Sequence, residues 1–443
     1  MFDEVNCKRM LLGVGALFFV IAISAQQIDI TLQKAIDIAL AENPTIRVAD
    51  KDIELKRIAD TEAWQALLPE VSASASIEHT LLAAEMNLGG TKFKMGRDDT
   101  NTASLIGTLS VPVFAPAVYQ NMKLTKTDIE LAREKARSSR LDLINQVTKA
   151  YYQMLLAQDS YKVMQQSYDI SKENYDVICS KFDVGRVSEY DKITAEVQMR
   201  SMNSSLVSAQ TGLTLSELQL KVLMGITTEV TLVLDDKLEN YESDLKLAEI
   251  GAGEAELENN STIRQLNMNR EILKRTLKIQ RTNFMPTVAF SLSGQYRSQY
   301  NNNWNLWNYD WSPSASFSIG VSIPIFRASN WTKLKSMKLQ LSELEDNRVN
   351  TQRQLAMAAQ NYVHNMASSI AQVGSNKQAV SQANKALSIA RTRYDVGRGT
   401  ILEMNQLEVA LTQAQLVYNQ SIYDYLRNKA DLDYTLGRET YLR

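Results

Sequence analysis

Residues able to carry catalysis or to bind metals are few and scattered in this chain of 443 residues. There are two histidines, His79 and His364, and two cysteines, Cys7 and Cys179, and no two of them lie close together in the sequence. Structural and catalytic zinc sites need several such ligands at short, defined spacings. The chain also has no G-x-S-x-G, P-loop or dinucleotide-type glycine motif. The sequence therefore predicts no enzyme, no cofactor and no metal site.

The most distinctive short motif is a hexapeptide that occurs twice, as KFDVGR at 181–186 and as RYDVGR at 393–398. Gly185 and Gly397 can end a helix in a left-handed conformation. The sequences S-x-x-D at 188–191 and T-x-x-E at 400–403 are typical helix starts. The motif is thus explained as the turn of a helical hairpin. The alternative, which we keep open, is a surface role for the valine and arginine exposed at each turn.

The two motifs belong to a duplicated chain. When they are placed in register, Gly225 falls on Gly437 and Pro112 falls on Pro324 at one common offset. Further upstream, ENPTIR (42–47) matches NNSTIR (259–264). Self-similarity that keeps its order over so long a stretch indicates a repeated structural unit. We predict a first repeat at 28–225, a connection at 226–244 and a second repeat at 245–437.

Each repeat is predicted to hold a helix, two strands, a very long helix and a returning helix. Apolar residues in the first long helix recur at alternating steps of four and three, which is typical of a coiled coil: Leu143, Val147, Ala150, Met154, Ala157, Tyr161, Met164 and Tyr168. The predicted ranges are strands at about 70–79 and 103–113 and helices at about 117–180 and 187–224, then strands at about 286–296 and 313–325 and helices at about 329–392 and 400–436.

The four strands alternate between apolar and serine-rich positions. Such strands, about ten residues long, are typical of a membrane β-barrel, although a soluble sheet shows the same alternation. The aromatic-rich connection at 297–311 favours a membrane interface. We expect the apolar positions to face lipid, among them Phe290, Leu292, Phe317 and Ile319.

Export is indicated at the N-terminus, where Lys8 and Arg9 precede an apolar run from Met10 to Ile23. This pattern predicts a signal peptide at 1–25. The formal net charge of −2 gives no electrostatic reason to expect a nucleic-acid partner.

Four strands are too few to close a membrane barrel. An open sheet edge in lipid leaves backbone groups unpaired at several kcal/mol each. The smallest membrane barrels have about eight strands. Several chains must therefore pool their strands, two copies for eight or three for twelve.

The whole pattern resembles the TolC family of trimeric outer-membrane efflux channels. The resemblance is carried by the duplicated unit, by the strand exits LSVPVF (109–114) and VSIPIF (321–326), and by RYDVGRGTILEMNQLEVAL (393–411). It implies a mainly helical chain with a small β part. As a homotrimer, this chain would form a 12-stranded outer-membrane barrel continued by a periplasmic barrel of 12 helices. Pro112 and Pro324 would then mark the transition from barrel to tunnel.

The resemblance also implies partners for the hairpin turns. These would face the inner membrane and meet the periplasmic adaptor of a tripartite pump, and through it an inner-membrane transporter. The docking residues that we expect are Val184, Gly185, Arg186, Val396, Gly397 and Arg398.

One departure from the family pattern concerns the gate. Family members often close the tunnel with rings of aspartates, whereas the stretch at 375–391 contains no acidic residue. A gate could instead pair Asp183 or Asp395 with Arg391 or Arg393. Solvated surface charge is the alternative interpretation of these four residues.

The function that we expect is a passive outer-membrane conduit, spanning the periplasm, for substrates moved by a partner pump. A type I protein secretion duct of the same fold is an alternative. A different class, a periplasmic coiled-coil scaffold or adaptor without a pore, would keep the hairpins but have no use for the strands.

Overall fold

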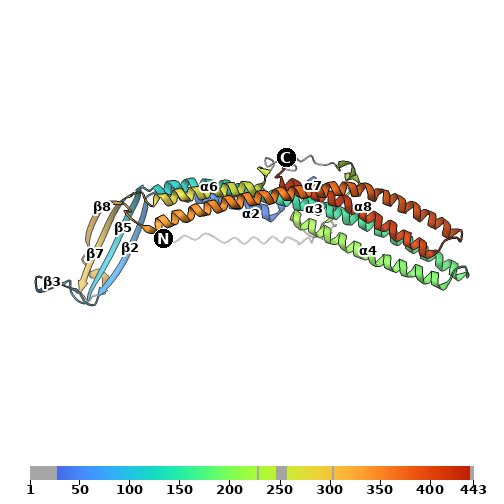
Figure 1. The fold of residues 1–443 in the computed structure, drawn as a ribbon. Helices are drawn as coiled ribbons and strands as arrows, with labels where there is room; N and C mark the ends of the chain where they lie inside the picture. The colour runs from blue at the N-terminus through green and yellow to red at the C-terminus, as the bar shows by residue number, and fades with distance from the viewer. Residues whose placement is uncertain (1–26, 227–228, 246–256, 302–303, 440–443) are drawn as a thin grey trace, which may run out of the picture.

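The computed structural model describes residues 27–226, 229–245, 257–301 and 304–439. The predicted signal peptide at 1–25 lies outside the described residues. The molecule is elongated, with a β-sheet at one end and two helical turns at the other (Figure 1). Two helices run most of its length, α3 (Pro116–Asp183) and α7 (Ala328–Asp395), each of 68 residues. At 1.5 Å per residue, each is roughly 100 Å long.

The long helices return as two hairpins. Helix α3 pairs with α4 (Glu189–Met224), and α7 pairs with α8 (Ile401–Thr435). Helix α8 also packs against α3, which joins the two hairpins side by side. The heptad positions Leu143, Val147 and Met154 are buried in this packing. Apolar burial along the seams therefore holds the hairpins together.

A second pair of helices extends the hairpins toward the sheet, α2 (Pro44–Gln65) and α6 (Ser261–Thr282). The Asn43 side chain accepts a bond from the Thr45 amide and donates to the Leu223 carbonyl, both at 2.8 Å. In the second repeat Asn260 accepts from the Thr262 amide at 2.8 Å and donates to the Thr435 carbonyl at 2.7 Å. In each repeat, one asparagine thus caps a helix and also bonds to the end of another helix. The same joint between two helices therefore occurs twice in the chain.

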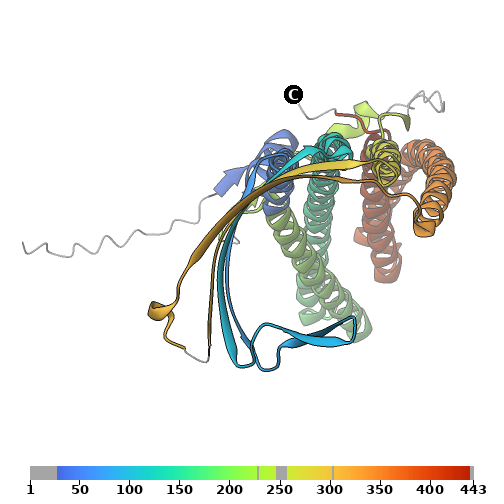
Figure 2. The same cartoon turned by 90° about the vertical axis from the view of Figure 1, so that its left-hand side faces the viewer.

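The sheet contains β2 (Glu70–Thr80), β5 (Thr100–Phe114), β7 (Thr287–Asn301) and β8 (Ser312–Ser322) in that order, with every pair antiparallel. Viewed along the molecule, the strands form an open, curved sheet (Figure 2). Val71, Leu109, Leu292 and Phe317 align across it in one row. Ser72, Thr108, Ser293 and Ser316 form the next row, which points to the other face. The predicted fold class, mainly helical with a small sheet in a duplicated unit, is confirmed.

The two prolines at the strand exits lie in different settings. Strand β8 ends at Ser322, so Ile323 and Ile325, which we expected inside the strand, lie between β8 and α7. Pro324 has no N–H to continue the ladder. In contrast, Pro112 lies within β5, where the register shifts between Pro112 and Phe114. A missing donor is accommodated there by an irregularity in the ladder.

Smaller elements complete the chain. Near the middle of the molecule, β1 (Gln27–Asp29) pairs in parallel with β6 (Thr231–Val233), and α1 (Leu32–Glu42) and the 3-10 turn η1 (Leu238–Asp244) pack there against the long helices. At the far end of the sheet, β3 (Ala84–Leu88) and β4 (Thr91–Met95) form a hairpin, and η2 (Leu306–Asn308) lies in the connection between β7 and β8. None of these elements was predicted from the sequence.

Candidate functional site

The hexapeptide motif forms the two turns at the end of the molecule opposite the sheet (Figure 1). Gly185 has φ +71° and Gly397 has φ +75°. The Arg186 amide donates to the Lys181 carbonyl, and the Arg398 amide to the Arg393 carbonyl, each at 2.8 Å. This is the bond that a left-handed glycine makes available at a helix end. The two turns therefore have the same backbone geometry.

The returning helices begin in related ways. Ser188 and Asp191 form a reciprocal capping box at the start of α4, with bonds of 3.2 and 3.1 Å. Thr400 accepts from the Glu403 amide at 3.2 Å at the start of α8. The Glu403 carboxylate forms an ion pair with Arg393 at 3.9 Å. The turns are thus fixed by local polar bonds and leave their outer side chains free for contact.

The six expected docking residues lie on the surface of these turns. Val184 and Val396 are 68% and 64% exposed. Arg186 and Arg398 are exposed beside them. Exposed apolar side chains next to cations are a surface suited to a protein partner.

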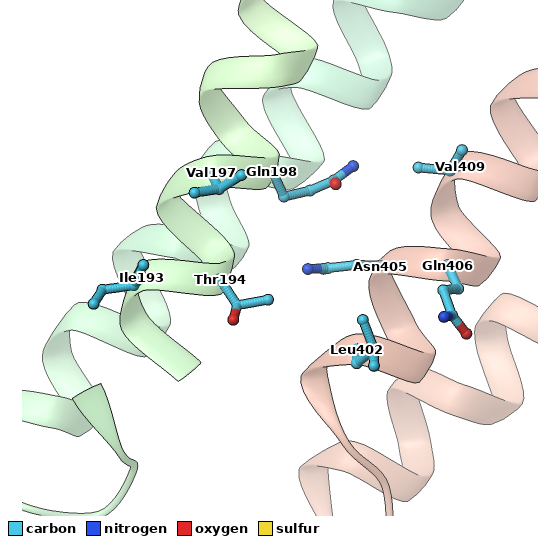
Figure 3. Close-up of a pocket in the computed structure, with 8 residues that line it drawn as sticks. All are labelled: Ile193, Thr194, Val197, Gln198, Leu402, Asn405, Gln406 and Val409. Carbon is cyan, nitrogen blue, oxygen red and sulfur yellow. The ribbon is translucent and has the colours of Figure 1, made fainter. Parts of the chain in front are cut away.

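A groove of about 430 Å³ lies behind the turns, between α4 and α8 (Figure 3). Figure 3 shows Thr194 and Gln198 on α4 facing Leu402 and Asn405 on α8. Apolar and amide side chains line this groove in similar number: Ile193, Thr194, Val197, Gln198, Leu402, Asn405, Gln406 and Val409. Sequence reasoning missed the groove, because its two walls come from different repeats.

The four candidate gate residues are brought to this end of the molecule, but their arginines pair elsewhere within the chain. Arg391 lies 3.7 Å from Glu173 on α3. Arg393 pairs with Glu403, as described above. Asp183 and Asp395 are exposed, and neither takes part in an ion pair with another described residue. A gate built from these four residues stays a prediction.

The four residues expected to face lipid lie on one face of the sheet. Phe290 is opposite Ile319, and Leu292 is opposite Phe317. Phe317 and Ile319 are 74% and 66% exposed. No other described part of the chain covers this apolar face of the sheet.

The histidines lie apart from each other. His79 bonds Asn101 at 2.6 Å near the far end of the sheet, and His364 is exposed on α7. Among the described residues there is no group of three histidine, cysteine or acidic side chains that could hold a metal ion. No helix in the described ranges is long and apolar enough to cross a membrane.

Comparison with known proteins identifies the family. The family model described as "Outer membrane efflux protein" matches residues 35–226 and 253–438. The chain is 24% identical to outer membrane protein TolC of Vibrio cholerae over 334 residues, 73% of this chain and 75% of the relative. It is 22% identical to TolC of Escherichia coli over 417 residues, 90% of this chain and 80% of the relative. The crystal structure of the outer membrane protein VceC from Vibrio cholerae has the same fold, with a TM-score of 0.71 at 16% identity, covering 92% of this chain and 96% of VceC.

The family match, together with the shared fold, thus defines an outer-membrane channel protein with a large periplasmic helical part. The chain belongs to the outer membrane efflux protein family, since both repeats match the family model. This family consists of channel proteins and not of enzymes. The expected function, an outer-membrane channel of an export system, and the expected location are confirmed.

Proposed function

We propose that three copies of the chain form one channel, a passive conduit for solutes that an inner-membrane transporter moves by way of a periplasmic adaptor. The observation that carries this proposal is the four-stranded sheet. Its outer strands, β2 and β8, each pair with only one strand among those described. An unpaired edge in lipid is costly, whereas three such sheets joined edge to edge give twelve strands and no free edge.

The strand directions support closure by copies of the same chain. Because the order β2-β5-β7-β8 is antiparallel throughout, β8 of one copy runs antiparallel to β2 of the next. The alternation of apolar and polar faces then continues around the barrel. The same joining places the helices of three copies in one ring.

Exposed apolar side chains on the outer helices also support this assembly. On one flank they lie on α2: Val48, Leu55, Ile58 and Trp64. On the other flank they lie between β8 and α7 and on α7 itself: Ile325, Phe326, Trp331 and Leu339. A neighbouring copy would bury both flanks, and apolar burial stabilises by about 25 cal/mol per Å².

Assembly and conduction can be measured on the purified protein. In detergent we expect a particle with the mass of three chains, which inserts into planar bilayers and conducts ions. A stably folded single protomer without conductance would overturn the proposal.

The hairpin turns are proposed as the contact for the adaptor, because Val184, Val396 and their neighbouring arginines are exposed at the end farthest from the sheet. The Gly397 amide donates to the Tyr394 carbonyl at 3.0 Å, and proline lacks both this donor and the positive φ angle. We therefore expect Gly397→Pro or Gly185→Pro to abolish efflux and to leave the trimer intact.

Drug accumulation in cells and cross-linked trimers on gels check these variants. The matched control is Gly374→Ala, which changes a glycine inside α7 where an added Cβ meets nothing within 4 Å. Normal drug resistance in the proline variants would rule out docking at the turns.

A further inference from the structure

A buried carboxyl group lies where the two hairpins meet. Glu408 on α8 is 2% exposed and faces α3. The Ser171 hydroxyl donates to one of its oxygens at 2.7 Å, and the Asn174 amide lies 3.5 Å from the other. A buried carboxyl group is tolerated when it is hydrogen-bonded, but its charged form is strongly disfavoured without a counter-ion.

The polar contact between the hairpins continues one turn further along both helices. Thr412 on α8 donates to the Ser167 hydroxyl on α3 at 3.0 Å, and both are buried. Ser167 in turn contacts the Met202 sulfur on α4 at 3.3 Å. We call the set Ser167, Ser171, Asn174, Glu408 and Thr412 the polar seam. Because α3 belongs to one repeat and α8 to the other, the polar seam is a contact between the hairpins.

Few charges act on Glu408. It takes part in no ion pair with another described residue, and the cation whose charge acts on it is Arg391 on α7, which itself pairs with Glu173. Charged and titratable groups on the surrounding helices include Asp169, Lys172, Glu173, Tyr175 and Cys179 on α3, Glu196 and Arg200 on α4, and Arg391 on α7. Burial raises the pKa of Glu408, while the Ser171 bond and the Arg391 charge act in the opposite direction.

We propose that Glu408 is a gating residue of the channel, whose protonated carboxyl latches α8 against α3 and whose ionisation releases the second hairpin from the first. This rests on the proposed function, in which the hairpin end of the conduit opens. Parting of α8 from α3 would widen that end, since both helices belong to its wall.

The direction of the pH dependence follows from burial. The carboxyl pKa is higher in the latched state than in the released state, where water reaches the group and the ordinary value is 4.5. The latch is therefore fully present below the ordinary pKa and is lost as the pH rises through the latched pKa. Each unit of difference between the two pKa values changes the latched-to-released ratio by about tenfold.

Conductance in planar bilayers provides the first test. Over a pH range that begins below the ordinary carboxyl value of 4.5, we expect the open-to-closed ratio of the natural channel to rise with pH, by about tenfold for each unit of pKa difference. Glu408→Gln keeps a neutral side chain that can still accept a hydrogen bond from Ser171. We therefore expect the open probability of this variant to stay low across that range. Asp169→Asn removes an exposed carboxylate near the polar seam on α3 and should titrate like the natural channel. A Glu408→Gln channel that titrates normally, or a natural channel that conducts without pH dependence, would overturn the latch.

Cross-linking provides a second test that does not depend on conduction. With Cys179→Ala as background, Ser167→Cys and Thr412→Cys place two thiols across the polar seam, where the hydroxyl oxygens lie 3.0 Å apart. Thiolate formation itself speeds oxidation as the pH rises, so the same chain with Glu408→Gln is the reference at each pH.

We expect the cross-linking rate, relative to this reference, to fall with rising pH when Glu408 is present. Equal rates in the two chains would refute the latch even in a channel that conducts. If no variant conducts, the proposed conduit fails, and the cross-linking rates still decide whether the latch exists.

Discussion

At the scale of single residues, the closest backbone approach at a described glycine is at Gly437. This residue has φ +64°, and a Cβ added there would clash with the Asn259 carbonyl oxygen. Its counterpart in the first repeat, Gly225, has φ +71° and would meet the Glu42 carbonyl oxygen at 3.0 Å. The ends of α8 and α4 thus pass so close to the next helix that only glycine fits.

We therefore expect Gly437→Ala to lower the free energy of unfolding by more than the roughly 1–2 kcal/mol that a left-handed conformation alone costs a residue with a Cβ. The matched control is Gly212→Ala inside α4, where a Cβ meets nothing within 4 Å and should stabilise the helix by about 1 kcal/mol. Thermal unfolding of both variants in detergent measures the difference. Equal melting temperatures would contradict the close approach.

The sequence could not reveal Glu408 as a buried residue. Apolar residues in α8 recur at heptad spacing, as at Met404, Leu407 and Leu411, and mark one face of the helix. A polar residue between these positions is ordinarily read as exposed. Helix α8 has two partners, however, so a second stripe is buried against α3, including Glu408 and Thr412. Its polar members pair with Ser167 and Ser171, which are equally inconspicuous in the sequence.

At the scale of elements, the joint between stacked helices combines two functions in one side chain. In the second repeat the Asn260 oxygen caps α6, and its nitrogen donates to the end of α8. Loss of a helix cap costs about 1 kcal/mol, and a carbonyl left unsatisfied in a buried place costs about 1–3 kcal/mol.

Asn260→Asp should separate the two functions, because a carboxylate still caps α6 but cannot donate to the Thr435 carbonyl. We expect Asn260→Ala to lower the unfolding free energy by about 2 kcal/mol or more. Asn260→Asp should lower the unfolding free energy by only part of this amount. Chemical unfolding of the two variants side by side measures both changes in free energy. An alanine variant as stable as the natural chain would show that the joint is held by apolar packing alone.

Most of the elements follow from the sequence because their patterns are local. The alternation of apolar and serine-rich positions predicted the four strands of the sheet. The heptad spacing and the glycine turns predicted the four longest helices. Elements that depend on distant partners were missed. Strand β1 is three residues long and exists by pairing with β6, which lies two hundred positions away in the chain. The hairpin of β3 and β4 has short strands, whose alternation is too brief to be distinguished from a loop.

At the scale of the whole molecule, the two faces of the sheet should differ in what they contact. Leu292 and Phe317 lie on the apolar face, and Ser293 and Ser316 lie on the face that the proposed barrel turns inward. A charge on a lipid-facing strand position costs about 2–4 kcal/mol near the middle of the bilayer.

Phe317→Arg should therefore reduce the amount of trimer in the outer membrane, whereas Ser316→Arg should leave assembly intact and shift the ion selectivity of the channel. The two substitutions introduce the same side chain at adjacent positions, so only the face differs. Membrane fractionation and bilayer recordings measure the outcomes. If both variants assembled equally well, the assignment of the faces would be wrong.

The equal length of α3 and α7, 68 residues each, sets a constraint on how such a chain can change. The two turns reach the same distance from the sheet only while α3 and α7 have equal lengths. Seven residues inserted into each arm of the first hairpin, α3 and α4, would push its turn about 10 Å past the other turn. A longer periplasmic reach therefore requires matching insertions in all four hairpin helices, so that variation in length should occur in both repeats together.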